Sequence, residues 1–148
     1  MKKSLKLILV VLILGLSFIL TACEKETPIM EKELPSEIKS YVERHFSMDK
    51  ISFSVKDQDG VKLTYDITLQ SGVKLEFNSA KEIIDIDGNN KKLPDSVIPE
   101  KILSYVGSVF PNAFVTDWKL EGRFQKVELN NSMDLLFDAD GNFKKIDD

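Results

Sequence analysis

A twelve-residue segment that occurs twice is the feature that most constrains how this chain can fold. Pro35–Phe46 returns as Pro99–Phe110 at a constant offset of 64 positions, and six of the twelve residues are identical. A second match follows at an offset of 60, where residues 67–69 and 75–77 resemble residues 127–129 and 135–137. Because internal repeats indicate one structural unit used more than once, we expect two copies of one helix-then-strands unit after residue 33.

The repeated segment has the apolar spacing of a helix. In the first copy, one stripe at i, i+3, i+4, i+7 and i+8 is formed by Ile38, Tyr41, Val42, His45 and Phe46, which is typical of an amphipathic helix. A proline at the start of each copy suits a first helical turn. The segments that follow alternate apolar and polar residues between glycine-containing turns, and this predicts antiparallel strands with one covered face.

We therefore expect an α+β fold of two tandem helix-plus-antiparallel-sheet repeats, residues 34–92 and residues 93–148. A unit of roughly 55 residues buries too little surface to be comfortable alone. The two units should share a core or form one continuous sheet.

Residues 1–22 have the pattern of a bacterial secretory signal. Three lysines in Met1–Lys6 precede the uncharged and almost wholly apolar run Leu7–Leu20, which is shorter than the roughly 20 residues that a membrane span needs. The run ends in Leu20-Thr-Ala-Cys23, which resembles the lipobox of bacterial lipoproteins and contains the only cysteine of the chain. The resemblance implies cleavage before Cys23 and acylation of its thiol and its new amino group. Two or more acyl chains anchor a protein stably, whereas one does so only marginally.

Loss of residues 1–22 removes three lysines and no acidic residue. It leaves 17 basic against 24 acidic side chains, a net charge of −7. This balance argues against nucleic acid as a partner, since nucleic acids and anionic lipid surfaces both attract basic patches. The charged segment Glu24–Glu33 contains Pro28 and lacks an apolar period. Together with Cys23 it predicts a tether that holds the folded part off the membrane. The alternative is a short helix packed on the domain.

Three Asp-Gly turns resemble fragments of a calcium-binding loop, at residues 57–60, 85–88 and 138–141. An EF-hand loop needs its glycine at position six and a glutamate at position twelve, whereas these turns have glycine at position four. Ordinary hairpin turns explain them better. We expect no metal site.

Catalytic signatures are missing from the sequence. The only histidine, His45, lies on the apolar helix stripe, and its repeat equivalent is Val109, so we interpret it as a packing residue. No nucleophilic serine motif, zinc signature or glycine-rich phosphate loop is present. We expect no catalytic residues and no cofactor.

The outward face of the predicted sheet differs between the copies. In the first copy it is polar. In the second copy, Phe124 and Leu136 occupy positions that are Thr and Glu in the first. Trp118 and Leu120 lie an odd number of residues after Val115, so the alternation of the strand places them on the face opposite to Val115. Exposed apolar clusters with tryptophan are typical of partner surfaces. We therefore predict that Trp118, Leu120, Phe124 and Leu136 bind a partner. The alternatives are packing between the halves, packing against residues 93–98, or a one-residue bulge near Asp117 that turns Trp118 inward.

Both copies carry the pattern of a known family. Leu34-Pro35 and Ile98-Pro99 stand at the helix starts, and Val127–Phe143 has the form Val-x-Leu, Leu-x-Phe-Asp and Gly-x-Phe at the family's spacing. Over residues 34–148 the chain resembles the bacterial PepSY-like family, also described as β-lactamase-inhibitor-like. It departs from the pattern at Ser132, where the family favours glycine, and at Asn78 and Lys81, where Asp and Gly are usual.

The resemblance implies an extracytoplasmic α+β module of two helix-plus-sheet repeats, similar to inhibitors that grip an enzyme with a concave sheet. It implies no catalytic residue. We expect a lipid-anchored, non-enzymatic binding module of the bacterial cell envelope, periplasmic or surface-exposed, that holds a protein or peptide on its sheet face, with inhibition as one form of that binding. The alternative is an envelope sensor or buffer of a small ligand or cation.

Overall fold

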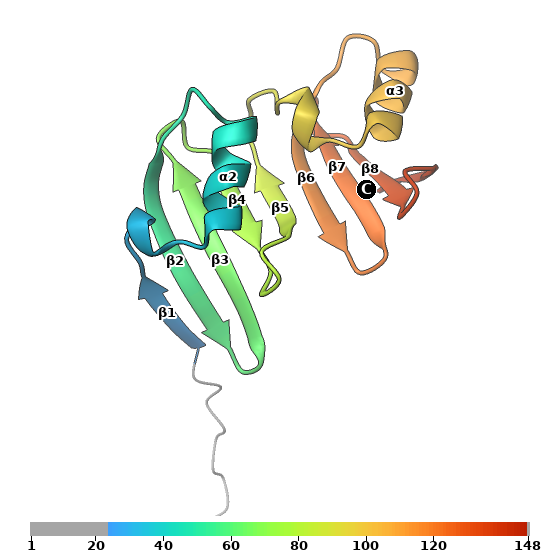
Figure 1. Ribbon diagram of the computed structural model, residues 1–148. Helices are drawn as coiled ribbons and strands as arrows, with labels where there is room; N and C mark the ends of the chain where they lie inside the picture. The colour runs from blue at the N-terminus through green and yellow to red at the C-terminus, as the bar shows by residue number, and fades with distance from the viewer. Residues whose placement is uncertain (1–23, 148) are drawn as a thin grey trace, which may run out of the picture.

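A computed structural model describes residues 24–147 of the chain. Within them, two α-helices accompany nine strands that form one antiparallel sheet (Figure 1). The two 3₁₀ turns are η1 Glu31–Glu33 and η2 Asp95–Val97, and the helices are α2 Ser36–His45 and α3 Glu100–Val109. The strands are β1 Glu24–Pro28, β2 Ile51–Asp59, β3 Lys62–Leu69, β4 Lys74–Phe77, β5 Ile83–Asp87, β6 Val115–Glu121, β7 Phe124–Leu129, β8 Asp134–Asp138 and β9 Phe143–Asp147.

The sheet is a meander in which every strand pairs with its neighbours in the chain, from β1 to β9. Strands β5 and β6 join the two halves, with Ile86 opposite Trp118. One continuous sheet was one of the two arrangements that the sequence left open, and this pairing forms it. The pairing also explains how halves of this size remain folded, because the inner edge strand of each half, β5 or β6, is covered by the other half.

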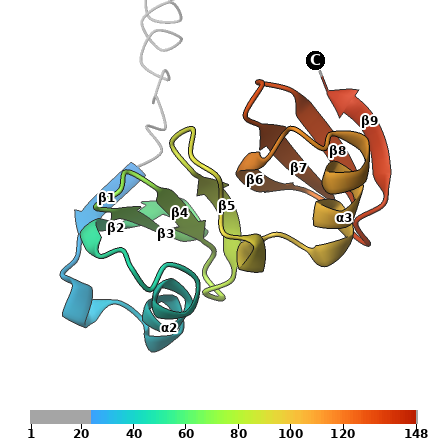
Figure 2. The ribbon, with the colours of Figure 1, turned by 90° about the horizontal axis from the view of Figure 1, so that it is seen from above.

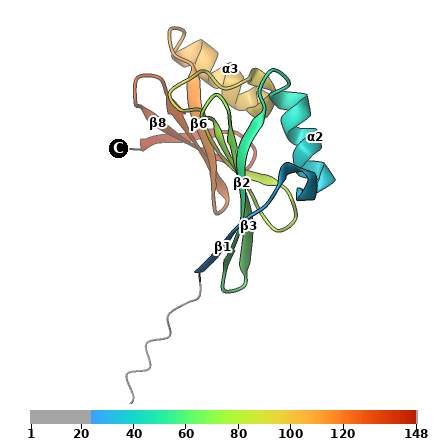
Figure 3. The same ribbon diagram turned by 90° about the vertical axis from the view of Figure 1, so that its left-hand side faces the viewer.

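Both helices lie on the same side of the sheet (Figures 2 and 3). One row of aligned residues crosses the sheet and is buried from β3 to β8; its members are Ile67, Leu75, Ile86, Trp118, Val127 and Leu135. Helix α2 packs Ile38 and Val42 into the same core, and α3 packs Ile102 and Val106. Since all these side chains form a single cluster, the opposite face of the sheet is free of helices. We call it the open face.

Each helix is held over the sheet by an equivalent aromatic contact. The ring of Tyr41 meets Phe77 edge-on at 5.3 Å between centroids. The ring of Tyr105 meets Phe137 in the same way at 5.4 Å. Edge-to-face pairs at this distance are favourable, and they account for the tyrosine that the sequence repeats in both helices.

The prediction of a tether at residues 23–33 is wrong for the residues that the structure describes. Glu24–Pro28 forms the edge strand β1, paired along its length with β2. The backbone N–H of Ile29 then donates to the carbonyl of Ser54 at 3.0 Å, and the Ser54 hydroxyl donates back to the carbonyl of Ile29 at 2.7 Å. Charged side chains suit a strand at the solvent edge of a sheet, so the absence of an apolar period did not exclude strand formation here. The rest of the segment includes only the 3₁₀ turn η1.

Candidate functional site

The open face of the sheet is lined mainly by charged side chains. Two rows of aligned residues cross it. The first contains Asp66, Glu76, Asp85, Lys119, Lys126, Leu136 and Lys145. The second contains Thr68, Lys74, Asp87, Asp117, Glu128, Asp134 and Asp147. Successive residues of a strand point to opposite faces, which is why these charges alternate with the buried core positions.

Lysines neutralise part of this acidic surface. The ion pairs join Lys62 to Glu76 at 3.3 Å, Lys74 to Asp87 at 3.6 Å, Lys119 to Asp85 at 2.7 Å, and Lys126 to Asp134 at 2.7 Å and Asp147 at 3.4 Å. Among residues 24–147, the carboxylates of the open face without such a partner include Asp57, Asp66, Asp117 and Glu128. We call these four the unpaired carboxylates.

The surroundings of the unpaired carboxylates disfavour their negative charge. Burial, and then the nearby charges of Glu76 and Asp57, raise the pKa of Asp66 to about 6. Burial also raises the pKa of Asp117 and that of Glu128 above their ordinary values, with like charges nearby adding to the effect. The Oδ1 atom of Asp57 is buried and has no hydrogen-bond partner within residues 24–147. Because an approaching cation would relieve each of these costs, the open face favours positively charged ligands.

Two shallow hollows on the open face share Asp85. One, of about 250 Å³, lies among Asp66, Thr68, Lys74, Glu76 and Asp87. The other, of about 210 Å³, lies among Asp117, Lys119, Glu128 and Asp134. Both volumes fall below the roughly 300–1,000 Å³ of typical small-molecule sites. The hollows therefore suit single side chains of a larger partner better than a whole small molecule.

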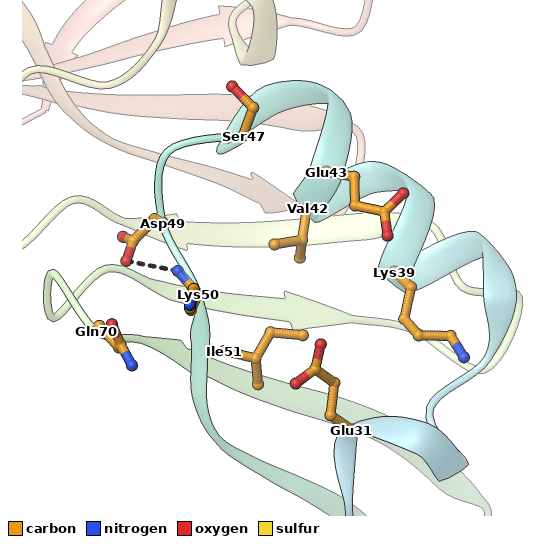
Figure 4. A pocket seen from close by; sticks show the side chains of 9 residues that line it. All are labelled: Glu31, Lys39, Val42, Glu43, Ser47, Asp49, Lys50, Ile51 and Gln70. Atoms are coloured by element: carbon orange, nitrogen blue, oxygen red, sulfur yellow. Dashed lines mark hydrogen bonds between the residues drawn. The ribbon is translucent and has the colours of Figure 1, made fainter.

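A larger hollow, of about 570 Å³, lies on the helix side of the molecule at the edge of the sheet (Figure 4). Its walls carry charges of both signs, including Lys39, Glu43 and Lys50. The Asp49 carboxylate is already engaged, because its Oδ1 accepts the backbone N–H groups of Lys50 at 2.9 Å and Ser71 at 3.2 Å. The other charged side chains of this hollow come from η1, from α2 and from the segment before β2 (Figure 4). They carry both signs of charge, so no single ligand chemistry is favoured there.

The predicted apolar patch does not form, because Trp118 lies on the covered face. It is 6% exposed and aligned with Ile86 and Val127 in the core. The cause is a β-bulge: the register of β6 against β7 shifts between Val115 and Asp117, which reverses the alternation of the strand. The bulge was one of the alternatives that the sequence left open.

The other three patch residues are divided between the two faces. Leu120 aligns with Gln125 and Phe137 on the covered side, although it is 40% exposed. Phe124 and Leu136 are half-buried on the open face, as predicted, and the guanidinium of Arg123 lies 5.2 Å from the centre of the Phe124 ring.

An equivalent bulge brings an unpredicted aromatic side chain to the open face. The register of β2 against β3 shifts between Ile51 and Phe53, so that Ser54 is buried and Phe53 is 53% exposed. At both bulges a hydroxyl donates to a carbonyl of the next strand: Ser52 to Thr68 at 3.0 Å and Thr116 to Glu128 at 3.2 Å. A hydroxyl residue at the same place in both copies was the signal that could have located the bulges.

The aspartates of two Asp-Gly turns serve the turns themselves. Oδ1 of Asp138 accepts the backbone N–H groups of Asp140 at 3.1 Å and Asn142 at 2.8 Å, and the Lys144 ammonium pairs with Oδ2 at 2.7 Å. These bonds, led by that of Lys144, hold the pKa of Asp138 well below its usual range. Oδ1 of Asp87 likewise accepts the N–H of Asn89 at 2.7 Å. Within residues 24–147, no three Asp, Glu, His or Cys side chains converge in the manner of a metal centre.

His45 is half-buried and links helix α2 to turn η2. Its Nδ1 lies 2.9 Å from the Ser96 hydroxyl, and its ring lies 4.5 Å from that of Tyr41. Burial, and then the charge of Arg44, lower its pKa. Its hydrogen bonds within the described part of the chain include no carboxylate, so the orienting group that a histidine base normally has is not in place.

A protein-family model described as "Putative beta-lactamase-inhibitor-like, PepSY-like" matches residues 20–85 and again residues 63–145. The chain belongs to this PepSY-like family. The resemblance inferred from the helix starts and from residues 127–143 is thereby confirmed. Among curated proteins, none matches the chain.

Solved structures of similar proteins share the fold. A "putative calcium-regulated periplasmic protein" from Bacteroides thetaiotaomicron is 26% identical with a TM-score of 0.79, covering 83% of this chain and 97% of its own. A "putative periplasmic protein" of the DUF2874 family from Bacteroides vulgatus is 25% identical with a TM-score of 0.78, covering 84% and 98%. A further "putative periplasmic protein" from B. vulgatus is 27% identical with a TM-score of 0.78, covering 84% of this chain and 100% of its own. In residues 24–147 of this PepSY-like chain, neither helix has the length and apolarity of a membrane span.

Proposed function

We propose that this PepSY-like protein is a non-enzymatic binding module of the bacterial cell envelope. It is held outside the cytoplasm by acyl chains at Cys23 and grips a lysine- or arginine-rich segment of a protein or peptide on its open face. The observation that carries the proposal is the set of unpaired carboxylates on a sheet face without helices. Complementary charge selects a cationic partner.

Charge alone would give a weak and unspecific contact, and apolar side chains supply the rest. Phe53 aligns with Thr68 at one end of the second row. In the second half, Leu136 is a member of the first row, and Phe124 lies next to Lys126 on the same face of β7. Aromatic residues are enriched among the anchors of protein interfaces. From β2 to β8 the strands span about 29 Å at ~4.8 Å per strand. An extended partner segment of about nine residues would cross that distance.

The anchor and the address rest on separate support. Cys23 lies outside the described residues, so the lipobox pattern at residues 20–23 supports its acylation. The solved relatives are described as periplasmic proteins, which agrees with a position outside the cytoplasm. The family description supports inhibition as one form of the binding.

We also propose that residues 34–92 and 93–148 are two tandem repeats of one unit. The family model matches the chain twice. The bulges at Ser52 and Thr116, with hydroxyl bonds to equivalent carbonyls, support the same conclusion. Superposing the two segments tests this, since a common origin requires the bulges to coincide.

Binding of a defined cationic peptide tests the function. Full-length protein in detergent is titrated against a fluorescent ten-residue lysine peptide and followed by fluorescence anisotropy. Replacing Asp66 and Asp117 by Asn and Glu128 by Gln should weaken binding about tenfold, at roughly 0.5 kcal/mol for each surface charge pair.

The control variant changes the net charge equally on the helix side, with Glu31, Glu43 and Glu100 each replaced by Gln. It should bind as wild type does. Equal weakening in both variants would show attraction to net charge alone and would remove the open face as the site.

Cation sensing is a second candidate function. The solved relative from B. thetaiotaomicron is described as calcium-regulated, and the raised pKa values of Asp66 and Asp117 show carboxylates in need of positive charge. Calorimetry with calcium on full-length protein should then give heat that the Asp66→Asn, Asp117→Asn variant lacks. No heat across millimolar calcium would exclude this candidate.

A further inference from the structure

The described part of the chain begins as a strand, one residue after the proposed anchor. Glu24, which directly follows Cys23, is already paired with Asp59 of β2. Consecutive Cα atoms are about 3.8 Å apart, and paired strands are about 4.8 Å apart. The first described residue is thus already fixed in the sheet, in contrast to the tether that the sequence predicted.

The tip of the β2–β3 hairpin lies beside Glu24, the first residue of β1. The tip consists of Asp59, Gly60, Val61 and Lys62 and joins the ends of β2 and β3 opposite the start of β1. This hairpin and the start of β1 lie at the end of the molecule away from the helices (Figure 3). We propose that the hairpin tip rests on the phospholipid bilayer when Cys23 is acylated. The inference rests on the anchor within the proposed function.

The chemistry of the tip fits a position at the level of the lipid headgroups. Val61 is an apolar side chain that is fully exposed to solvent, and Gly60 turns the backbone with φ +55°. Val61 can enter the headgroup region without disturbing the core, and each buried methylene adds only about 0.8 kcal/mol. The acyl chains hold the protein, and the tip sets its orientation.

The opposite end of β2 stands clear of the membrane. Strand β2 has nine residues, which span about 30 Å at ~3.3 Å per residue. Met48, in the loop before β2, is also fully exposed. It is therefore a matched control for Val61 at the far end of the same strand. The open face extends between these two ends, from the headgroups outward. A segment of a membrane-bound partner can therefore reach it.

Lipid-resident quenchers test the orientation. In acylated protein the sulfur of the only cysteine is blocked, so Val61→Cys or Met48→Cys provides one reactive thiol for an environment-sensitive fluorophore. After reconstitution into phosphatidylcholine vesicles containing a nitroxide-headgroup lipid, the label at 61 should be quenched at least about twofold more than the label at 48. Equal quenching, or stronger quenching at 48, would overturn the proposal.

Insertion of ten Gly and Ser residues between Cys23 and Glu24 is the second variant. It adds slack at this point, so the difference between the two labels should disappear. A difference that persists would show that the attachment geometry is not its cause. Mass spectrometry that finds no acyl group on Cys23 would overturn the anchor and this orientation together, whereas binding of the lysine peptide to the open face is measured independently of both.

Discussion

The indole Nε1 of Trp118 donates a hydrogen bond of 3.0 Å to Oε1 of Gln125 inside the core. Both residues are 6% exposed. The Gln125 amide nitrogen donates in turn to the carbonyls of Asp138 at 3.3 Å and Ala139 at 3.2 Å. The only tryptophan of the chain thus joins β6 to β7 and to the turn after β8, and it is not available to a partner.

Removing the indole should destabilise the fold. Trp118→Phe leaves a cavity and a buried Gln125 oxygen without its donor, and we expect a loss of about 2–4 kcal/mol in the free energy of unfolding. Urea unfolding followed by circular dichroism measures it. A loss below about 0.5 kcal/mol would contradict the buried position of Trp118. The folded Trp118→Phe variant should bind a partner with the same affinity as wild type.

Gly88 should tolerate no side chain. A Cβ atom there would lie 2.3 Å from the carbonyl oxygen of Thr116 and 2.8 Å from that of Lys91. The N–H of Gly88 donates to the same Thr116 carbonyl, and this hydrogen bond joins the two halves. We expect Gly88→Ala to cost several kcal/mol, as overpacked sites do. Gly107, in α3, has no atom near its added Cβ, so Gly107→Ala is the control and should stabilise the protein by up to about 1 kcal/mol. Thermal unfolding compares the two, and equal melting temperatures would contradict the junction described.

Two departures from the family pattern fall at strained turn positions. Ser132 and Lys81 have φ of +61° and +67°, a left-handed conformation that costs a residue with a Cβ atom about 1 kcal/mol. Ser132→Gly should therefore raise stability by about 0.5–1 kcal/mol. The urea midpoint measures the change. Asn131→Gly is the control, because the neighbouring turn residue Asn131 has no positive φ. A Ser132→Gly midpoint at or below that of wild type would contradict this account of the turn.

The sequence predicted the two helices and the antiparallel strands, because the helical stripe and the period-two alternation are local signals. A continuous sheet was one of two ways in which it allowed the halves to join. It did not predict which face Phe53 and Trp118 occupy. One extra residue in a bulge moves every side chain beyond it to the opposite face of the sheet. The apolar pattern of the sequence does not indicate where that residue lies. Strand β1 was missed for a different reason, since its pairing with β2 depends on a hairpin distant in sequence. The unpaired carboxylates were missed because ion pairing depends on register across strands.

Asp66 should make the stability of the fold depend on pH. Its pKa is raised in the folded state from the ordinary 3.8 to about 6, so its stabilising contribution is complete below about pH 3.8 and is lost as the pH rises through about 6. Between pH 4 and pH 7, wild type should lose stability relative to the Asp66→Asn variant, which cannot ionise at this position. Urea unfolding of both proteins at each pH measures the difference. A constant difference, or one that grows in favour of wild type, would contradict the burial of this carboxylate.

Photo-cross-linking tests most directly whether the open face is the binding surface. Benzoylphenylalanine replaces Phe53 on the open face or Val109 on α3, two side chains of nearly equal exposure at 53% and 50%. Each full-length protein is irradiated with the ten-residue lysine peptide. We expect the peptide to be cross-linked at position 53 and not at position 109, and the yield at 53 to fall when Asp66, Asp117 and Glu128 are neutralised. Equal yields at the two positions, or a yield at 53 that is insensitive to those carboxylates, would contradict binding on the open face.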